Sequence, residues 1–410
     1  MPFRKIRQIK QFFVFYASLF ILLCAACVEK PAHREMESII GKDYFEVLGV
    51  KSFINAGLPY STLSGSQMWP EVMDAMNYGM RHRAKYKELH DAVGRRIAML
   101  IGCESAMVPA GASSGITLGT AACMTGTDEE RIRQLPYTEG MKNEVIIQKA
   151  HRYTYEQAVR TAGAKLVEVE TSDDIKRVIG PRTAMMLFYY GRDPKGKIKV
   201  KEFIRLGKKY NVPVFLDGAT TVPPAENLKK IMALGCDLAC FSGGKGLQGP
   251  FSAGLLLGRK DLIEGARLNS SPNDGTIGRG MKVSKEELLA MMVAVEVSLR
   301  RDYDADVKQG KARMAQIGDH VKDLPGIQTE VFVPGHADQM PRLRLLWDEK
   351  KIRISPGDLK KCLRDGEPSI EVVSFGQSGG EFHISSWMLR QDEVNIVARR
   401  IREVLEKVME

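Results

Sequence analysis

The chain has 410 residues, 44% of them hydrophobic, and carries a formal net charge of +10. This length allows one large hydrophobic core and a second, smaller domain. The basic residues are spread without a long run of Lys or Arg, which favours an ordinary solvated surface with mildly anionic ligands over a surface for a polyanion. The five cysteines that follow residue 30 form no CxxC pair, so nothing in that part of the sequence looks like a zinc motif or a disulfide framework.

The first thirty residues have the composition of an export signal. A basic start is followed by the uncharged stretch Phe12–Ala26 and then by small residues. This stretch is shorter than the roughly 20 residues of a membrane-spanning helix. Cys24–Cys27 resembles a lipoprotein processing box, which makes Cys27 a candidate for lipid attachment. We therefore expect residues 1–30 to be a signal peptide or lipoprotein signal, and the protein to be exported, either periplasmic or lipid-anchored to the membrane. The alternative is a cytoplasmic protein whose start codon is assigned too far upstream.

The sequence after this signal divides into three predicted parts. Residues 31–75 form an N-terminal arm, residues 76–285 a large domain, and residues 286–410 a small C-terminal α+β domain. In the large domain, apolar strand-like runs alternate with helical stretches. These runs are Val145–Ile147, Lys165–Val169, Ala184–Tyr190, Val212–Leu216, Leu238–Phe241 and Leu255–Leu257. The alternation predicts an α/β fold with a mostly parallel sheet flanked by helices, in which ligand sites form beyond the carboxyl ends of the strands.

A candidate phosphate-binding segment, Gly111–Gly115, precedes the predicted helix Ile116–Cys123. Free backbone N–H groups at the start of a helix, together with the hydroxyls of Ser113 and Ser114, suit a phosphate. The same residues are also typical of a plain helix N-cap. This segment alone therefore leaves both interpretations open.

Two polar residues follow predicted strands. His151 comes just after Val145–Ile147, where an imidazole could stack on a bound aromatic ring, and a loop histidine without such a role is the alternative. Asp217 ends the strand Val212–Leu216. A carboxylate at the end of a buried strand costs desolvation free energy unless it is paired. A protonated pyridine nitrogen would be a suitable partner, and Mg²⁺ binding or a strand-end cap are the alternatives.

Lys245 lies in a turn of small residues, Ser242–Gly246, between two apolar runs. A lysine held in this setting can lose its proton and attack a carbonyl group. The phosphate-loop spacing GxxxxGK[ST] is absent because Gly246 follows Lys245, which argues against an ATPase. Together with Asp217 and a phosphate bond from Ser242, the turn predicts a pyridoxal phosphate site in which Lys245 forms the aldimine.

From Phe45 to the C-terminus the sequence resembles the SelA-like group of fold-type I pyridoxal phosphate enzymes. This group includes L-seryl-tRNA(Sec) selenium transferase and D-glucosaminate-6-phosphate ammonia-lyase. The resemblance rests on FSGGKGLQGPFSAGLLLGRKDLI and GRGMKVSKEELL, with support from INAGLPYSTLSGSQMWPEV, VPAGASSGITLGTAACMTG and FLDGATTVPPAENL. It implies a fold-type I transferase fold with pyridoxal 5'-phosphate as cofactor.

The resemblance also implies a role for each site residue. Lys245 would be the Schiff-base lysine, Asp217 would pair with the pyridine nitrogen, and His151 would stack on the ring. The phosphate would be held by Ser113, Ser114 and Ser242. Arg279 and Lys282 match family positions near the site and are expected there across a subunit interface.

The expected activity is that of a lyase or transferase acting on an amino acid or amino-sugar acid, with α,β-elimination of the ammonia-lyase type as the reaction. Racemase or aldolase chemistry, the selenium transferase reaction, and an exported binding protein without catalysis remain alternatives. The ammonia-lyase-like members usually carry Arg and Gln where Gln248 and Phe251 stand, which leaves the substrate open. The candidates for substrate contact in the small domain are Arg342, Arg344, Arg364 and His383. We expect a small-molecule substrate, a homodimer or higher homo-oligomer, and no nucleic-acid partner.

Overall fold

The computed structural model describes residue 38 and residues 40–373 and 381–409. The described residues up to residue 52 belong to one unit, and those from residue 53 onward form a second, compact unit. In the first unit, helix α2 (Tyr44–Val47) begins after Asp43, whose carboxylate accepts hydrogen bonds from two backbone N–H groups of the first turn. The predicted export signal lies outside the described residues. Within the described part of the chain, no helix is long and apolar enough to cross a membrane.

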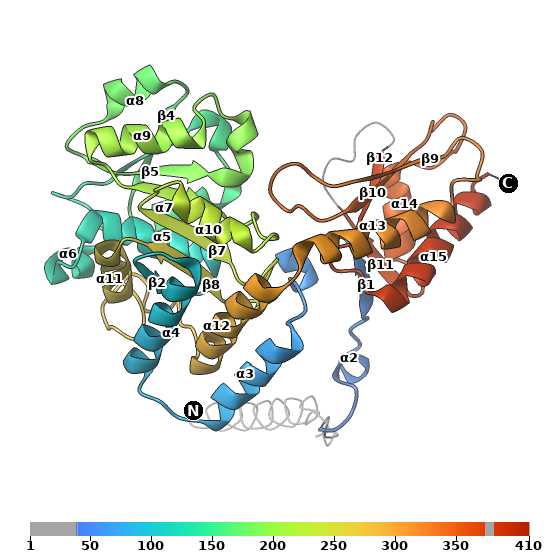
Figure 1. The fold of residues 1–410 in the computed structure, drawn as a ribbon, viewed down its shortest axis with the longest axis horizontal. Helices are drawn as coiled ribbons and strands as arrows, with labels where there is room; N and C mark the ends of the chain where they lie inside the picture. Colours follow the sequence, from blue (N-terminus) through green and yellow to red (C-terminus); the bar gives the residue numbers. More distant parts are fainter. Residues whose placement is uncertain (1–37, 39, 374–380, 410) are drawn as a thin grey trace, which may run out of the picture. The chain divides into compact units, whose positions relative to one another are not determined.

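The second unit contains a seven-stranded sheet with the strand order β2-β8-β7-β6-β5-β3-β4 (Figure 1). Its strands are β2 (Ser105–Met107), β3 (Glu144–Gln148), β4 (Lys165–Val169), β5 (Thr183–Tyr189), β6 (Val214–Asp217), β7 (Leu238–Ser242) and β8 (Gly254–Gly258). All neighbouring strands are parallel except β8, which runs antiparallel to both β2 and β7. The mostly parallel α/β sheet predicted from the sequence is confirmed, and each of the six predicted apolar runs overlaps one of its strands.

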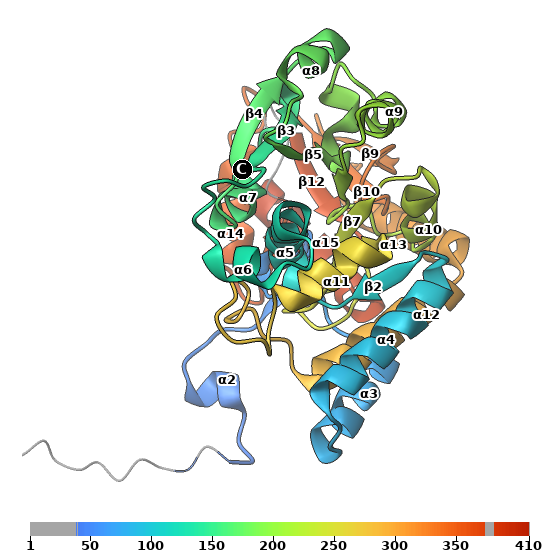
Figure 2. The same cartoon turned by 90° about the vertical axis from the view of Figure 1, so that its left-hand side faces the viewer.

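Helices cover both faces of this sheet, which explains why its central strands are apolar throughout. One face packs against α5 (Gly111–Thr125), α7 (Gln157–Thr161) and α11 (Lys260–Leu268), with α6 (Glu129–Gln134) beside α5. The opposite face packs against α3 (Pro70–Arg81), α4 (Tyr86–Ile101), α8 (Ser172–Val178), α9 (Val200–Tyr210), α10 (Glu226–Ala233) and α12 (Lys285–Arg300). We call these the α5 face and the α9 face. Figure 2 shows α3, α4 and α12 side by side.

A second core lies in the C-terminal part of the same unit. It contains the antiparallel sheet β12-β10-β9 and the parallel strand pair β1-β11. The strands are β1 (Phe53–Ala56), β9 (Gln328–Phe332), β10 (Arg342–Leu346), β11 (Ser369–Val372) and β12 (Glu381–Ser385), and the helices are α13 (Tyr303–Asp319), α14 (Pro356–Arg364) and α15 (Val394–Lys407). Short 3-10 helices occur at Ser61–Leu63, Lys149–His151, Thr154–Glu156, Tyr190–Lys195 and Gln391–Glu393.

Two elements pack differently from the predicted division into arm, large domain and small domain. Strand β1, expected in the arm, pairs with β11 and contributes Ile54 and Ala56 to the C-terminal core. Helix α12, expected to open the small domain, packs against α3 and α4 and contributes to the core of the large sheet. Its N-terminus is fixed by a capping box in which Ser284 and Glu287 bond reciprocally.

Candidate active site

The carboxylate of Asp217 lies at the carboxyl end of β6, on the α5 face of the sheet. The residue is 2% exposed. Its Oδ1 accepts hydrogen bonds from the backbone N–H of Ala219 at 2.9 Å and from the thiol of Cys240 at 3.8 Å, and its Oδ2 accepts one from the Tyr153 hydroxyl at 2.7 Å. Burial raises the pKa of Asp217, and these hydrogen bonds oppose that rise.

The turn that carries Lys245 follows β7 and is packed so closely that it requires glycine. A β-carbon at Gly246 would lie 2.2 Å from the carbonyl oxygen of Val222, and one at Gly244 would lie 2.7 Å from the Cα of Phe251. The turn is closed by hydrogen bonds from Gly249 N to Gly243 O at 2.9 Å and from Gln248 N to Lys245 O at 3.0 Å. The glycine-rich sequence therefore fixes the position of the lysine backbone.

The Lys245 side chain is half-buried and, among the described residues, forms no hydrogen bond or ion pair. Burial lowers the pKa of its amine, while the nearby carboxylates of Asp217 and Asp338 raise it. A lysine with a lowered pKa holds more of the neutral, nucleophilic amine at neutral pH. Lys245 thus lies in a partly desolvated setting under the influence of the Asp217 carboxylate, and its role as the Schiff-base lysine stays a prediction.

The start of α5 lies beside Ser242. In the β7–β8 pair, Ser242 stands opposite Gly254, and the N–H of Gly254 donates to Pro109 O at 3.0 Å, just before α5. A β-carbon at Gly254 would lie 2.9 Å from Ala112 N. Glycine at this position therefore allows the first turn of α5 to pack closely against β8. No side chain in the described part of the chain caps this helix N-terminus. Its free N–H groups and the hydroxyls of Ser113, Ser114 and Ser242, which have no hydrogen-bond partner within the described residues, can together bind an anion.

Tyr153 was not predicted to belong to the site. It comes two residues after His151, and its ring stacks on that of Tyr189 at the end of β5, with centroids 4.5 Å apart and an interplanar angle of 16°. Its hydroxyl donates to Asp217, which raises the pKa of Tyr153 in addition to the effect of burial. The sequence offered one usable indication, an aromatic residue in the loop after a parallel strand.

His151 lies on the other face of the sheet from Asp217. Its ring is fully buried and contacts Phe188 edge-on, with centroids 4.4 Å apart, and Phe188 belongs to the core of the α9 face. A β-carbon at Gly196 would lie 2.6 Å from His151 Nε2. The structure therefore does not bring this imidazole to Asp217 or Lys245, and burial lowers the pKa of His151 to about 4.

Arg279 forms no hydrogen bond or ion pair with the other predicted site residues among the described residues. Its Nε donates to Asp274 at 2.8 Å in the segment between α11 and α12. A site role for Arg279 across a subunit interface stays a prediction.

A loop from the C-terminal part reaches the carboxyl ends of β5 and β6. His336 Nε2 lies 2.6 Å from Tyr190 O, and the N–H of Gln339 lies 3.5 Å from Pro223 O. Between them, Asp338 is close enough to Lys245 to raise the pKa of its amine, and it forms an ion pair with Arg342. Asp338 was not predicted from the sequence, whereas Arg342 was a candidate for substrate contact.

The other candidates for substrate contact have partners of their own. Arg344 pairs with Glu330 at 3.1 Å, Arg364 with Asp365 at 3.2 Å, and His383 with Glu381 at 3.3 Å. Of the four candidates, only Arg342 is linked to Lys245, through Asp338.

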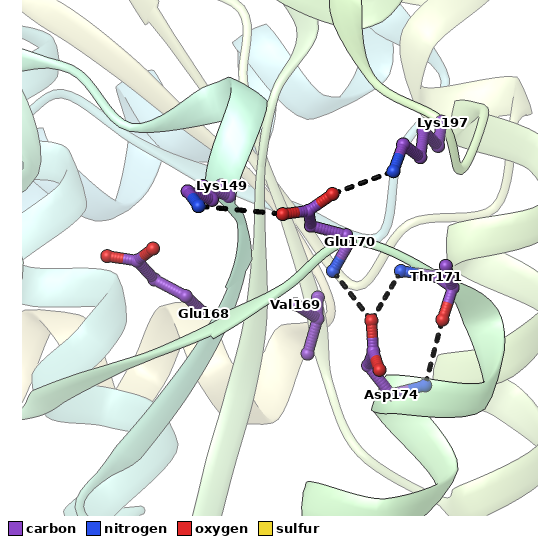
Figure 3. Close-up of a pocket in the computed structure, with 7 residues that line it drawn as sticks. All are labelled: Lys149, Glu168, Val169, Glu170, Thr171, Asp174 and Lys197. Atoms are coloured by element: carbon purple, nitrogen blue, oxygen red, sulfur yellow. Dashed lines mark hydrogen bonds and ion pairs between the residues drawn. The ribbon is translucent and has the colours of Figure 1, made fainter.

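A hollow of about 440 Å³ lies beyond the ends of β3 and β4, at the edge of the sheet. In Figure 3, Glu170 lies between Lys149 and Lys197 and pairs with both, while Asp174 caps α8. Both lysine side chains are about two-thirds exposed, at 66% and 67%. The charges of this hollow are thus already paired, and it shares no residue with the Lys245 site.

The site residues fit pyridoxal phosphate. A carboxylate has about four acceptor positions, and three donors occupy Asp217, so one position remains for a protonated ring nitrogen. The start of α5 and Ser242 supply an uncapped anion cradle for the phosphate, and Lys245 supplies an amine for the aldehyde. Among the described residues there is no group of three or more His, Cys, Asp or Glu side chains that could hold a metal ion.

Comparisons with known proteins agree with this assignment. The family model for SelA, L-seryl-tRNA selenium transferase, matches residues 74–309. The chain is 29% identical over 380 residues to 5'-C-glycyluridine monooxygenase-decarboxylase from Streptomyces sp, covering 88% of this chain and 92% of that protein. It is 25% identical over 373 residues to D-glucosaminate-6-phosphate ammonia lyase from Salmonella typhimurium, covering 88% of this chain and 98% of that protein.

The fold of this chain is similar to the folds of solved structures. The structure of a D-glucosaminate-6-phosphate ammonia-lyase matches with a TM-score of 0.79 and 24% identity, covering 90% of this chain and 100% of that one. By contrast, the L-seryl-tRNA(Sec) selenium transferase of Aquifex aeolicus matches over 52% of this chain and 53% of its own length. Since the family model spans more than half of the chain, the protein belongs to the SelA family and is an enzyme with the fold and the pyridoxal phosphate cofactor of the fold-type I group.

Proposed function

We propose that this enzyme catalyses an α,β-elimination, of the ammonia-lyase type, on an amino acid or amino-sugar acid. The observation that carries the proposal is the half-buried amine of Lys245, whose pKa is lowered by burial and which lies near the carboxylates of Asp217 and Asp338. Pyridoxal phosphate supplies, when bound, an electron sink for the carbanion formed at the substrate's α-carbon.

The proposed roles of the side chains follow from their positions. Lys245 would hold the cofactor through Nζ, and the same amine would take the proton from the α-carbon of the substrate. Asp217 would pair with the protonated ring nitrogen. A buried carboxylate costs desolvation free energy, and a partner cation offsets that cost. Ser113, Ser114, Ser242 and the start of α5 bind the phosphate.

Two features favour a lyase over a tRNA-dependent transferase. The chain covers 98% of the ammonia lyase from Salmonella typhimurium, but 44% and 53% of the selenium transferases from Mannheimia succiniciproducens and Aquifex aeolicus. Its basic residues also form no long run that would suit a nucleic acid. A small-molecule substrate is therefore the better proposal.

A second candidate reaction is oxidative decarboxylation of an amino acid carried on a nucleoside. It is favoured by the 29% identity to the glycyluridine monooxygenase-decarboxylase, which extends over 88% of the chain. Both reactions begin at the α-carbon of an amino acid. They differ in that the decarboxylation consumes oxygen and releases carbon dioxide, whereas the elimination releases ammonia.

The test is a substrate screen with purified protein lacking residues 1–30. Amino acids, amino-sugar acids and glycyl nucleosides are assayed for α-deuterium exchange, ammonia, oxygen uptake and carbon dioxide. We expect exchange and ammonia release with wild-type protein and with Lys260→Ala, an exposed lysine at the start of α11, but not with Lys245→Ala. Oxygen uptake without ammonia would favour the second candidate. Cofactor binding without exchange on any substrate would favour a non-catalytic binding protein.

We also propose, from the sequence, that the protein is exported by residues 1–30 and forms a homodimer or higher homo-oligomer. Palmitate labelling that is lost in Cys27→Ala would support a lipid anchor, and labelling that persists would rule out Cys27 as its site. Sedimentation of the holoenzyme measures the oligomeric state directly.

A further inference from the structure

The hydrogen bond from Tyr153 to Asp217 joins two residues on elements that are far apart in sequence. Tyr153 lies between β3 and α7, and Asp217 ends β6. The 2.7 Å distance between the tyrosine oxygen and Asp217 Oδ2 is typical of a strong O–H···O⁻ hydrogen bond. Ala219 and Cys240 donate to the other oxygen, so among the described residues Tyr153 is the donor that fixes the orientation of Oδ2.

Tyr153 is itself held in place from several sides. Its ring stacks on Tyr189, and its backbone N–H lies 3.4 Å from the carboxylate of Glu156. Glu156 in turn pairs with both Arg152 and Arg160. The guanidinium of Arg192 lies over Tyr189, 5.8 Å from its centroid, and bonds the carbonyl oxygen of Arg152. These contacts fix the position of the tyrosine side chain, so its hydroxyl reaches Asp217 in a defined orientation, as a positioning residue requires.

We propose that Tyr153 is a positioning residue for the cofactor: its hydroxyl holds the Asp217 carboxylate in the orientation in which Oδ2 can accept a hydrogen bond from the ring nitrogen. This inference rests on the proposed role of Asp217. The hydrogen bond also stabilises the ionised form of Asp217, whose pKa burial would otherwise raise further. Tyr153 thus favours both the orientation and the ionised state of the Asp217 carboxylate.

The alternative is that the hydroxyl merely satisfies a buried carboxylate and has no effect on the cofactor. The two interpretations differ in what Tyr153→Phe does. Loss of a positioning bond changes the protonation and the affinity of the cofactor, whereas loss of a purely structural bond changes the stability of the protein alone.

The experiment compares the holoenzymes of wild type, Tyr153→Phe and Tyr155→Phe. Tyr155 is a matched control because it lies in the same loop, is 54% exposed, and forms no hydrogen bond with Asp217. Two readouts are used, the dissociation constant of pyridoxal phosphate and the ¹⁵N chemical shift of the ring nitrogen in labelled cofactor. We expect Tyr153→Phe to weaken cofactor binding about tenfold to a hundredfold and to move the ¹⁵N signal toward the unprotonated form. Tyr155→Phe should match wild type.

A double variant isolates the coupling between the two residues. In an Asp217→Asn background, Tyr153→Phe should weaken cofactor binding less than about threefold further, because the charged acceptor is already absent. An equal effect in both backgrounds, or an unchanged ¹⁵N signal in Tyr153→Phe, would overturn the proposal. If wild-type protein carries no cofactor on Lys245, it is the proposed function that fails, and this outcome is seen before any Tyr153 variant is compared.

Discussion

Asp338 and Arg342 form a partly buried ion pair near Lys245. The side chains are 17% and 14% exposed, and the Nε of Arg342 has no hydrogen-bond partner among the residues that the structure describes. Burial raises the pKa of Asp338, and Arg342 opposes that rise. A partly buried pair of this kind is sensitive to the loss of either partner, since the other charge is then left uncompensated. The pair therefore couples the C-terminal loop to the lysine in the turn after β7.

We expect Asp338→Asn to lower the pKa of Lys245. The variant keeps the volume of the side chain and removes one of the two carboxylates that raise the pKa of the amine. The pH midpoint for reaction of the apoenzyme with pyridoxal phosphate should therefore move to lower pH. Asp274→Asn, which affects an exposed carboxylate paired with Arg279, should leave the midpoint unchanged. A midpoint that rises in Asp338→Asn would show that Asp338 does not act on the lysine through its charge.

We expect Ser242→Ala to weaken binding of the phosphorylated cofactor selectively. The variant removes one hydroxyl from the anion cradle at the start of α5 and leaves the backbone unchanged. A hydrogen bond to a charged group contributes about 1.5–3 kcal/mol, so the dissociation constant should rise about tenfold to a hundredfold. Pyridoxal without its phosphate is the control ligand, and its affinity should be the same for the variant and wild type. Equal losses for both ligands would place Ser242 away from the phosphate.

We expect Gly246→Ala to disrupt the lysine turn. Its β-carbon would lie 2.2 Å from Val222 O, so the turn or the Val222–Pro223 segment must shift. Overpacking of this kind costs about 1–3 kcal/mol in the free energy of unfolding. Gly280→Ala is the matched control, because a β-carbon there lies within 4 Å of no described residue other than its two chain neighbours. Chemical unfolding and cofactor absorbance measure both effects, and a Gly246→Ala protein as stable as Gly280→Ala would contradict the packing argument.

The sequence predicted the parts of the site that follow from strand ends and glycine turns. Asp217 and Lys245 were found because a parallel sheet places polar residues at the carboxyl ends of buried strands. Tyr153 was missed because the 3-10 helix Lys149–His151 turns the chain, so that His151 packs on the α9 face and Tyr153 on the α5 face. The spacing of apolar residues follows a period of 2 in strands and 3.6 in helices, and neither period describes such a turn. The sequence therefore does not show which of the two rings contacts Asp217.

Asp338 was missed for a different reason. It lies 93 residues after Lys245 in sequence, on a loop of the C-terminal part without a recognisable motif. Its place beside the lysine depends on contacts of that loop with Tyr190 and Pro223, which only the tertiary fold brings together. The place of β1 in the C-terminal core could not be predicted for the same reason, since β1 pairs with a strand more than 300 residues later in the sequence.

We expect His151 to affect stability more than the cofactor. Its buried imidazole has a pKa of about 4, below the ordinary value of 6.5, because burial disfavours the charged ring. Between these two values the unfolded chain binds the proton and the folded protein does not, so the free energy of unfolding falls as the pH falls from about 6.5 to 4, by up to about 3 kcal/mol. His151→Asn should reduce this slope, measured by chemical unfolding at several pH values, and leave the cofactor's absorbance and affinity near those of wild type. A ring that stacked on the cofactor, as the sequence alone suggested, would give the reverse pattern of an altered spectrum with an unchanged slope.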